Sequence, residues 1–273
     1  MTIEIRGLSV TYPTGLFGRG KPFQALDDVN LRISKGSIMG IVGESGSGKS
    51  TLGRVILRLL RPSAGQVLID GQDPYASEDP GFRRNVQAVF QDSGASLNPR
   101  RTVGASIREG LDIHRIGTPA EREEKVVHLL EQVGLSASYA TRMPHTLSGG
   151  QRQRINIARA VALEPKVLVA DEPVSALDTS VQAQVLELLA GLRRSTEMTM
   201  IFISHDLSVV REICDRAAIM HRGKLVETGA IDAIFEHPRH PVTQALMRDM
   251  PRLDVPVTLP TLSPQPTGLA YVS

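Results

Sequence analysis

Apolar and polar residues alternate in two stretches near the start of the chain, residues 3–12 and 29–33. A period of two puts successive side chains on opposite faces, so both stretches predict half-buried β-strands. The residues between them, 13–22, are rich in Gly, Pro and basic side chains and predict an exposed loop. Residues 66–71 predict a strand that ends in an Asp-Gly turn.

Four other runs also predict strands. They are residues 38–42, 86–90, 167–172 and 200–203. The first and the last two are short and apolar, which is typical of strands buried on both faces. Such strands, followed by helices, favour an α/β architecture.

Helical spacing appears between these strands. Apolar residues recur every three or four positions after the run at 38–42, at Leu52, Val55, Ile56 and Leu59. From residue 92 to about residue 159 the pattern is helical and has few strand-like runs. This change of character predicts a helical insert within the α/β core.

Two helix starts are marked by capping residues. Thr118 and Glu121 have the spacing of a capping box, with Pro119 at the first helical position, and the helix should stop at Gly134. Its apolar face consists of Val126, Leu129, Leu130 and Val133. Asp178 predicts the cap of a later helix. The buried face expected there is Val181, Val185, Leu188 and Leu192.

Residues 43–51, Gly-Glu-Ser-Gly-Ser-Gly-Lys-Ser-Thr, have the spacing of a phosphate-binding loop between a buried strand and a helix. Its glycines allow backbone N–H groups to converge on phosphate oxygens at the positive end of the helix dipole. Lys49 is placed to reach the outer phosphates, and Ser50 to put its hydroxyl on Mg²⁺. The other candidates for nucleotide contact are Gly43, Ser45, Gly46, Ser47, Gly48 and Thr51. The loop predicts a nucleotide but does not indicate its purpose.

A second glycine-containing helix start lies at residues 147–151, Leu-Ser-Gly-Gly-Gln. Ser148 and Gln151 have the N-cap and N3 spacing, and Gly149 and Gly150 stand between them. Alone, this pattern predicts only a capped helix. In a chain that also carries a phosphate-binding loop, it predicts a second anion-binding helix end.

Polar and aromatic side chains stand at the ends of predicted strands. Asp171 could hold the Mg²⁺ shell and Glu172 could orient the attacking water, although acids at a strand end can also serve only for solvation. His205 is either structural or a sensor of the γ-phosphate. Tyr12 is either an ordinary strand aromatic or a platform for adenine. Gln91 stands directly after the strand at 86–90.

Composition narrows the class of protein. The 273 residues suit one large domain or one with inserts, and 31 basic against 29 acidic residues argue against a nucleic-acid clamp. Cys214 is the single cysteine, which excludes a disulfide framework and fits a reducing compartment. The first residues lack the pattern of a signal peptide, and no apolar run approaches the length of a membrane span. We expect a cytosolic protein that reaches a membrane only through a partner.

Taken in order, these residues resemble the motifs of ATP-binding-cassette (ABC) ATPases. The matching segments are Tyr12 with the A-loop aromatic, 43–50 with Walker A, Gln91 with the Q-loop, 147–151 with the signature, 167–172 with Walker B, 175–178 with the D-loop and His205 with the switch histidine. The resemblance extends from residue 1 to about residue 250, and the signature pentapeptide is highly specific.

The resemblance implies a P-loop NTPase (RecA-like) core with an N-terminal antiparallel β subdomain and an inserted α-helical subdomain. The expected boundaries are residues 1–91 for the first part of the core, 92–158 for the helical subdomain, 159–235 for the second part of the core and 236–273 for a C-terminal extension.

Finer features are similar to the ATPases of peptide and nickel importers. They include residues 89–103 and the C-terminal stretch 234–247. One departure is His240-Pro241-Val242-Thr243, where the group usually has Tyr in third place. The cysteine cluster of some members is missing, so an iron–sulfur site is excluded. His237 and His240, separated by prolines, are expected in turns rather than in a metal site.

The resemblance also implies a mechanism with ATP and Mg²⁺. Two ATPase subunits would close head to tail, so that Ser148, Gly149 and Gly150 of one meet the γ-phosphate on Lys49 of the other. Further roles implied are catalysis for Glu172, His205 and Gln91, nucleotide contact for Tyr12, Gln151 and Asp178, and Mg²⁺ ligation for Ser50, Gln91 and Asp171.

The expected partners are transmembrane permease subunits, a second ATPase subunit and, indirectly, a substrate-binding protein, but no nucleic acid. A heterodimer is usual in the subgroup, and a homodimer is chemically open because both half-sites look intact. The chain would then lie on the cytoplasmic face of the membrane. A soluble ABC ATPase of repair, translation or cluster assembly is the alternative, and a small-molecule kinase leaves the signature unexplained. The transported cargo is not encoded in these motifs.

Overall fold

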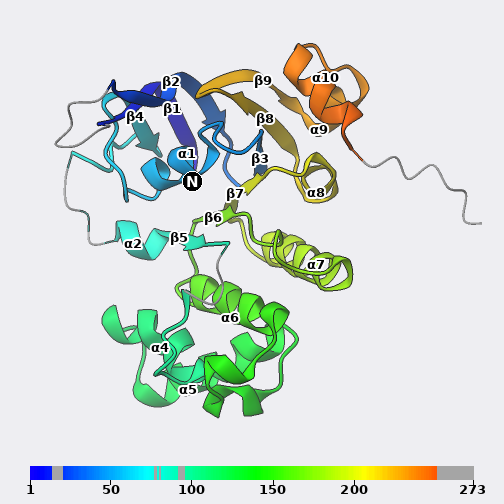
Figure 1. The fold of residues 1–273 in the computed structure, drawn as a ribbon. Coiled ribbons are helices and arrows are strands. Elements are labelled where there is room, and N and C mark those ends of the chain that lie inside the picture. The colour runs from blue at the N-terminus through cyan, green and yellow to red at the C-terminus, as the bar shows by residue number, and fades with distance from the viewer. Residues whose placement is uncertain (14–20, 77–78, 80, 92–95, 251–273) are drawn as a thin grey trace, which may run out of the picture.

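The structure is a computed structural model that describes residues 1–13, 21–76, 79, 81–91 and 96–250. Figure 1 shows two β-sheets and their flanking helices in the upper part and a group of helices, α4 to α6, in the lower part. Most of the loop expected at 13–22, and the tail beyond residue 250, lie outside the described residues. The predicted fold class, an α/β core with an antiparallel β part and inserted helices, is confirmed.

The smaller sheet is antiparallel, in the order β2-β1-β4. Its strands are β1 (Ile3–Tyr12), β2 (Phe23–Ile33) and β4 (Ala64–Ile69). The predicted strand at 29–33 is thus only the second half of β2, because shifts of register opposite Leu8 and Val10 break the alternation. The expected Asp-Gly turn follows β4, with Asp70 and Gly71 both left-handed (φ 48° and 79°).

The larger sheet has six strands in the order β5-β6-β7-β3-β8-β9. They are β3 (Ile38–Val42), β5 (Val86–Val89), β6 (Val167–Asp171), β7 (Thr199–Ser204), β8 (Arg216–His221) and β9 (Lys224–Ala230). Neighbouring strands are parallel except that β9 runs antiparallel to β8. The sequence pattern predicted the first four strands and missed β8 and β9.

Successive side chains of the central strands enter two different cores. In β7, Met200 and Phe202 pack into the core shared with the helices around α6 and α7, whereas Ile201 and Ile203 pack toward α1 and the antiparallel sheet. All four are fully buried. This two-sided burial is the reason that the central strands are continuously apolar and do not alternate.

Between residue 96 and residue 161 the described chain forms helices and no strand. They are α4 (Val103–Ile113), α5 (Pro119–Gln132), two short 3-10 helices (Ala137–Thr141 and Pro144–Thr146) and α6 (Gly149–Val161). The capping box of Thr118 and Glu121 is confirmed, and Gly134 follows the helix end with φ 72°. Val126, Leu129, Leu130 and Val133 are buried as expected.

The remaining helices lie beside the sheets. They are α1 (Lys49–Ile56), α2 (Phe82–Asn85), α7 (Thr179–Ser195), α8 (Leu207–Ile213), α9 (Ile231–Glu236) and α10 (Pro241–Arg248). Two details of the prediction were wrong. Leu59 lies beyond the end of α1 and is exposed, because Arg58 turns left-handed (φ 57°). In α7, Val181 and Leu188 are only half-buried, and Leu186 and Leu189 take the buried positions.

The Thr118 capping box allows a direct test of local stability. The Thr118 hydroxyl accepts from the Glu121 amide (3.3 Å), and the Glu121 carboxylate accepts from the Thr118 amide (2.6 Å). Thr118→Ala should lower the free energy of unfolding by about 1 kcal/mol, measured by urea denaturation. Glu121→Gln is the control, because glutamine can still reach back to the cap amide. Equal stability of Thr118→Ala and the wild type would contradict this account.

The last described helix is anchored by one carboxylate. Glu227 of β9 accepts hydrogen bonds from the amides of Arg239 and His240 (both 3.0 Å) and from the Thr243 hydroxyl (2.5 Å). Burial raises the pKa of Glu227, but these donors outweigh it and hold the pKa below its ordinary value. The His-Pro-Val-Thr stretch therefore forms the N-terminus of α10, and Thr243 is fully buried there.

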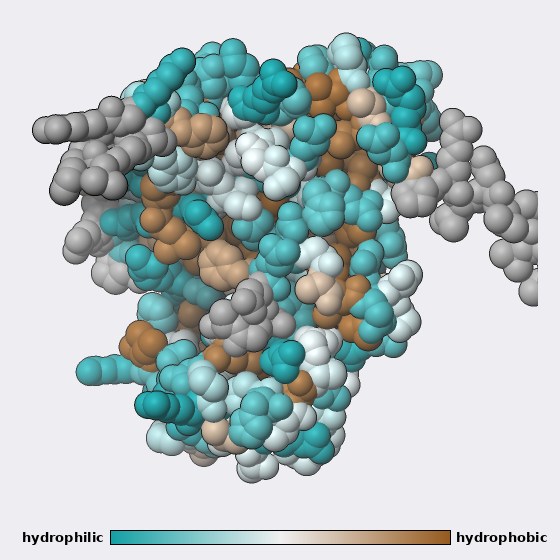
Figure 2. Space-filling model, in the orientation of Figure 1, coloured by the Kyte–Doolittle hydropathy of each residue, from teal (hydrophilic) through white to brown (hydrophobic). Residues whose placement is uncertain are grey.

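The surface is mostly hydrophilic in the view of Figure 2, with apolar side chains exposed in several separate places. Within the described part of the chain, no helix combines the length and the apolar character needed to cross a bilayer.

Candidate functional site

The glycine-containing loop joins β3 to α1, and glycine is required at both of its ends. A Cβ on Gly43 would lie 2.2 Å from the carbonyl oxygen of Met220. Gly48 is left-handed (φ 104°), and a Cβ there would lie 2.6 Å from the carbonyl oxygen of Ala25. Gly48 is also the N-cap of α1 and offers no side-chain acceptor to the first helical amides. The helix end therefore suits an external anion such as a phosphate.

Lys49 folds back across this loop. Its ammonium donates to the carbonyl oxygens of Gly43 (2.6 Å) and Glu44 (2.8 Å). Burial lowers the pKa of Lys49 below its ordinary value, although nearby carboxylates act in the opposite direction. The hydrogen bonds of this buried ammonium go to neutral carbonyl oxygens, and carboxylates lie nearby. A buried positive charge of this kind fits a site that also receives a phosphate. Ser47 supports the same view, because its buried hydroxyl has no hydrogen-bond partner in the described structure.

Ser50 and Asp171 come together from positions 121 residues apart. The Ser50 hydroxyl donates to the Asp171 carboxylate at 3.1 Å. Asp171 ends β6, and burial raises its pKa above the ordinary value despite this hydrogen bond. A hydroxyl and a carboxylate are the hard oxygen donors that Mg²⁺ prefers, so the pair fits such an ion beside the loop. Thr51 follows in the first turn of α1 and is half-buried.

Glu172 and His205 also meet. His205 Nδ1 lies 3.2 Å from Glu172 Oε1. Glu172 has a left-handed backbone (φ 48°), and its amide donates to the carbonyl oxygen of Ile203 on the neighbouring strand β7. The carboxylate is 18% exposed and the imidazole 55% exposed. The acid is thus held by the sheet while its histidine partner faces solvent.

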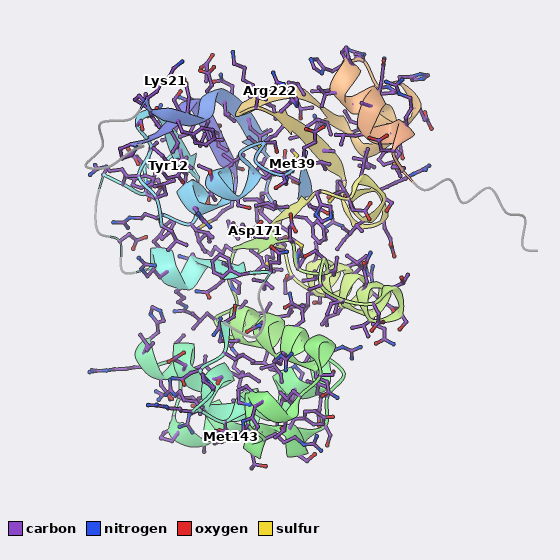
Figure 3. The ribbon with its side chains drawn as sticks, viewed as in Figure 1. Tyr12, Lys21, Met39, Met143, Asp171 and Arg222 are labelled. Atoms are coloured by element: carbon purple, nitrogen blue, oxygen red, sulfur yellow. The ribbon has the colours of Figure 1, made fainter. Side chains whose placement is uncertain are left out.

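Parallel pairing explains why these side chains share one edge of the sheet. Val42 is in register with Ser204, and Asp171 with Ile203, so the P-loop, the acid pair and His205 all follow the carboxyl ends of neighbouring strands. Ligands of open α/β sheets bind at this edge. Asp171 lies near the centre of the molecule in Figure 3.

Four other predicted residues lie after strands or in the P-loop. Gln91 is exposed just after β5, which pairs with β6. Tyr12 ends β1 opposite Phe23. Ser45 is exposed, and an added Cβ at Gly46 would meet nothing within 4 Å. The hydrogen bonds of Lys49 go to Gly43 and Glu44 and do not include these residues.

The signature segment lies on a different helix. Ser148 and Gln151 form the expected capping box at the start of α6, and the side-chain Nε2 of Gln151 also donates to the Tyr139 hydroxyl (3.1 Å). A Cβ on Gly150 would lie 2.4 Å from Val181 of α7. Asp178 caps α7 by accepting from the Val181 amide (3.0 Å), a contact that lowers its pKa.

α6 and the P-loop helix pack against different neighbours. α6 packs on α4, α5, α7 and β5, whereas α1 packs on β2, β6 and β7. Within one chain, the signature residues and the P-loop therefore belong to separate groups of elements.

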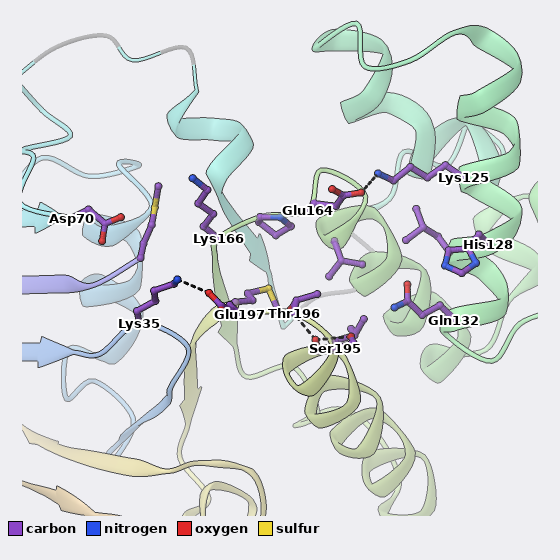
Figure 4. A pocket seen from close by; sticks show the side chains of 16 residues that line it. Lys35, Asp70, Lys125, His128, Gln132, Glu164, Lys166, Ser195, Thr196 and Glu197 are labelled. Atoms are coloured by element: carbon purple, nitrogen blue, oxygen red, sulfur yellow. Dashed lines mark hydrogen bonds and ion pairs between the residues drawn. The ribbon is translucent and has the colours of Figure 1, made fainter.

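A separate cavity of about 690 Å³ opens at the opposite, amino edge of the sheet, between α5 and the turns that precede β6 and β7. Figure 4 shows Lys35 paired with Glu197 and Lys125 paired with Glu164 at its margin. Leu129, Leu192 and Met198 are among its apolar lining residues. None of the predicted site residues lines it, and no motif in the sequence marks it.

A strand, a glycine loop and a helix, with an acid pair at the end of β6 in the same sheet, define a P-loop nucleoside-triphosphatase. The model of the ABC transporter family matches residues 26–175. The chain is 49% identical over 256 residues to the oligopeptide transport ATP-binding protein AppF of Bacillus subtilis, covering 91% of this chain and 78% of that protein. It is 45% identical to the oligopeptide transport ATP-binding protein OppF of Streptococcus mutans, covering 92% and 82%.

Among solved structures, the ATP-binding cassette MJ0796, a dimer in a post-hydrolysis state bound to ADP and Pi, aligns with a TM-score of 0.75. It is 31% identical, with 84% of this chain and 98% of that chain covered. The chain belongs to the ABC transporter family, as its nucleotide-binding ATPase.

Proposed function

We propose that this ATPase powers an ABC importer for peptides or a related small solute such as a nickel chelate. The observation that carries the proposal is the convergence of the Ser50–Asp171 and Glu172–His205 pairs beside the P-loop. The names of the relatives, both oligopeptide transport ATP-binding proteins, support the substrate class.

In the proposed nucleotide site, different elements bind the phosphates, the adenine and the metal ion. The amides at the start of α1 and Lys49 bind the phosphates of ATP, and Tyr12 stacks on the adenine. Ser50, Asp171 and Gln91 would hold Mg²⁺, which would neutralise charge on the phosphates. Ser45, Ser47 and Thr51 complete the phosphate contacts.

Hydrolysis is assigned to the carboxyl edge of the sheet. Glu172 accepts a proton from the attacking water and orients it toward the γ-phosphate. His205, already 3.2 Å from Glu172, contacts the γ-phosphate and keeps the carboxylate aimed. Gln91 joins the catalytic group from the end of β5.

The second half of the site comes from another cassette. Ser148, Gly149, Gly150 and Gln151 at the start of α6, together with Asp178, close on the ATP of the opposing subunit. The reason is that α6 and α1 pack on different elements in one chain, which leaves each P-loop open to a partner. ATP then stabilises the dimer because it contacts both faces, and loss of the γ-phosphate reopens it.

We further propose that the helical insert, residues 92–158, carries this opening and closing to transmembrane permease subunits. The chain would work on the cytoplasmic face of the membrane, paired with a second ATPase or with its own copy. A substrate-binding protein would take part indirectly.

The proposal is tested by identifying the proteins that co-purify with this chain from its own cell. We expect a chromosomally tagged protein to purify from detergent-solubilised membranes with two multispanning permease subunits, identified by mass spectrometry. Uptake of a radiolabelled oligopeptide should be lost in the Glu172→Gln strain. Recovery from the soluble fraction with nucleic acid, or unchanged uptake, would contradict the transport role.

A further inference from the structure

The turn between β8 and β9 contacts the P-loop but belongs to no nucleotide-binding motif. It consists of Arg222 and Gly223, both left-handed (φ 48° and 81°), between the paired residues His221 and Lys224. Two successive residues with positive φ define a type I′ turn. In Figure 3, Arg222 lies in the upper part of the molecule.

Gly223 connects two parts of the fold through its backbone. Its amide donates to the carbonyl oxygen of Ser47 in the P-loop at 3.0 Å. Its own carbonyl oxygen accepts from the amide of Asp27 in β2 at 2.9 Å. Lys224, the next residue, pairs with the Asp27 carboxylate at 3.1 Å. The P-loop, the turn and β2 are therefore linked in series by hydrogen bonds.

The two ends of the P-loop pack against two different strands, β8 and β2. Gly43 lies against the carbonyl of Met220 in β8, and Gly48 against the carbonyl of Ala25 in β2, each too close for a Cβ. A shift of the turn relative to β2 would therefore move the loop or force a clash. β2 also begins at Phe23, opposite Tyr12, so the same strand reaches from the loop to the proposed adenine platform.

We infer that Gly223 is a positioning residue for ATP binding, which holds the P-loop in place against β2. The inference rests on the proposed nucleotide site at residues 43–51. Glycine is needed because φ is +81° and because a Cβ would lie 3.0 Å from the carbonyl oxygen of Ala25. Any other residue would have to push the turn away from β2 or from the loop.

The chain offers a matched control for Gly223→Ala. Gly71 occupies the same place in the second type I′ turn, with φ 79° after Asp70 at φ 48°. A Cβ on Gly71 would meet nothing within 4 Å. Gly71→Ala thus imposes the same left-handed strain at a site remote from the P-loop. An effect seen only in Gly223→Ala therefore comes from displacement of the P-loop and not from backbone strain alone.

The experiment is a titration of wild type, Gly223→Ala and Gly71→Ala with the fluorescent analogue N-methylanthraniloyl-ATP and Mg²⁺, at a temperature where all three are folded. We expect Gly223→Ala to weaken binding about 5- to 30-fold, the factor equivalent to the loss of one or two hydrogen bonds. KM for ATP should rise by a similar factor with kcat unchanged. Gly71→Ala should bind as the wild type does, while both variants lose thermal stability.

Equal affinity of Gly223→Ala and wild type would overturn the inference and leave the proposed site intact. So would an equal loss in both glycine variants, since strain alone would then explain it. Failure of the wild type itself to bind the analogue would overturn the proposed nucleotide site, and the inference with it.

Discussion

Replacing Glu172 by glutamine is expected to reduce ATP turnover by about 10²- to 10⁴-fold, the usual contribution of a positioned general base. Glutamine has nearly the same volume, and its amide oxygen can still accept from His205, so the left-handed turn after β6 should keep its shape. What is lost is the carboxylate that takes a proton from water. Phosphate release from saturating Mg-ATP measures the effect.

ATP binding should survive in the same variant. Because the phosphates are held by Lys49 and the α1 amides rather than by Glu172, the dissociation constant for ATP should stay close to that of the wild type. Glu124→Gln, an exposed glutamate on α5, is the control for loss of one negative charge. Near-normal phosphate release from Glu172→Gln would show that Glu172 is not the base.

Glu172→Gln also decides how the complete site is built. Light scattering of this variant with and without Mg-ATP reports whether ATP holds two copies together. A doubled mass means that the chain supplies both the P-loop and the opposing signature. A monomer that still binds ATP means that a different ATPase supplies the signature.

Replacing Lys49 by alanine should abolish tight ATP binding. Each hydrogen bond from an ammonium to a charged acceptor contributes about 1.5–3 kcal/mol, which corresponds to a loss of about 10- to 100-fold or more in affinity. Titration with labelled ATP measures it. Lys166→Ala is the control, because this lysine lines the cavity at the opposite edge of the sheet.

The empty protein should not lose stability in Lys49→Ala. Burial lowers the pKa of Lys49, which means that the folded state disfavours the charged form. Removing the ammonium relieves that cost while it also removes the bonds to two loop carbonyls. An unfolding temperature close to that of the wild type without nucleotide, together with lost binding, would place the role of Lys49 in ligand contact. Unchanged ATP affinity would contradict the assignment.

Local features were predictable because each depends on residues a few positions apart. The capping boxes at Thr118 and Ser148 lie within single helical turns, and the structure contains both. The Asp70-Gly71 turn needs two left-handed residues, which its sequence favours. The apolar strands β3, β6 and β7 could be recognised because both of their faces are buried.

Other elements were missed where the local signal was weak. β9 is nowhere fully buried, so its sequence carries no strong pattern. The first half of β2 contains Asp27 and Asp28 and pairs with β1 across shifts of register. Helix α1 ends before Leu59 because Arg58 turns left-handed, and periodicity could not show that turn.

By itself the sequence determined the chemistry: a glycine loop with its lysine, two acids after an apolar strand, and a serine-capped second glycine helix. Only the tertiary structure decided which of these residues meet. Ser50 reaches Asp171, and Glu172 reaches His205, because β6, β7 and β3 are neighbours in the sheet, an order that no local pattern specifies. The same holds for Gly223, whose contact with the P-loop depends on β8 lying beside β3. Caps and turns depend on nearby residues, whereas strand order depends on the packing of the whole chain.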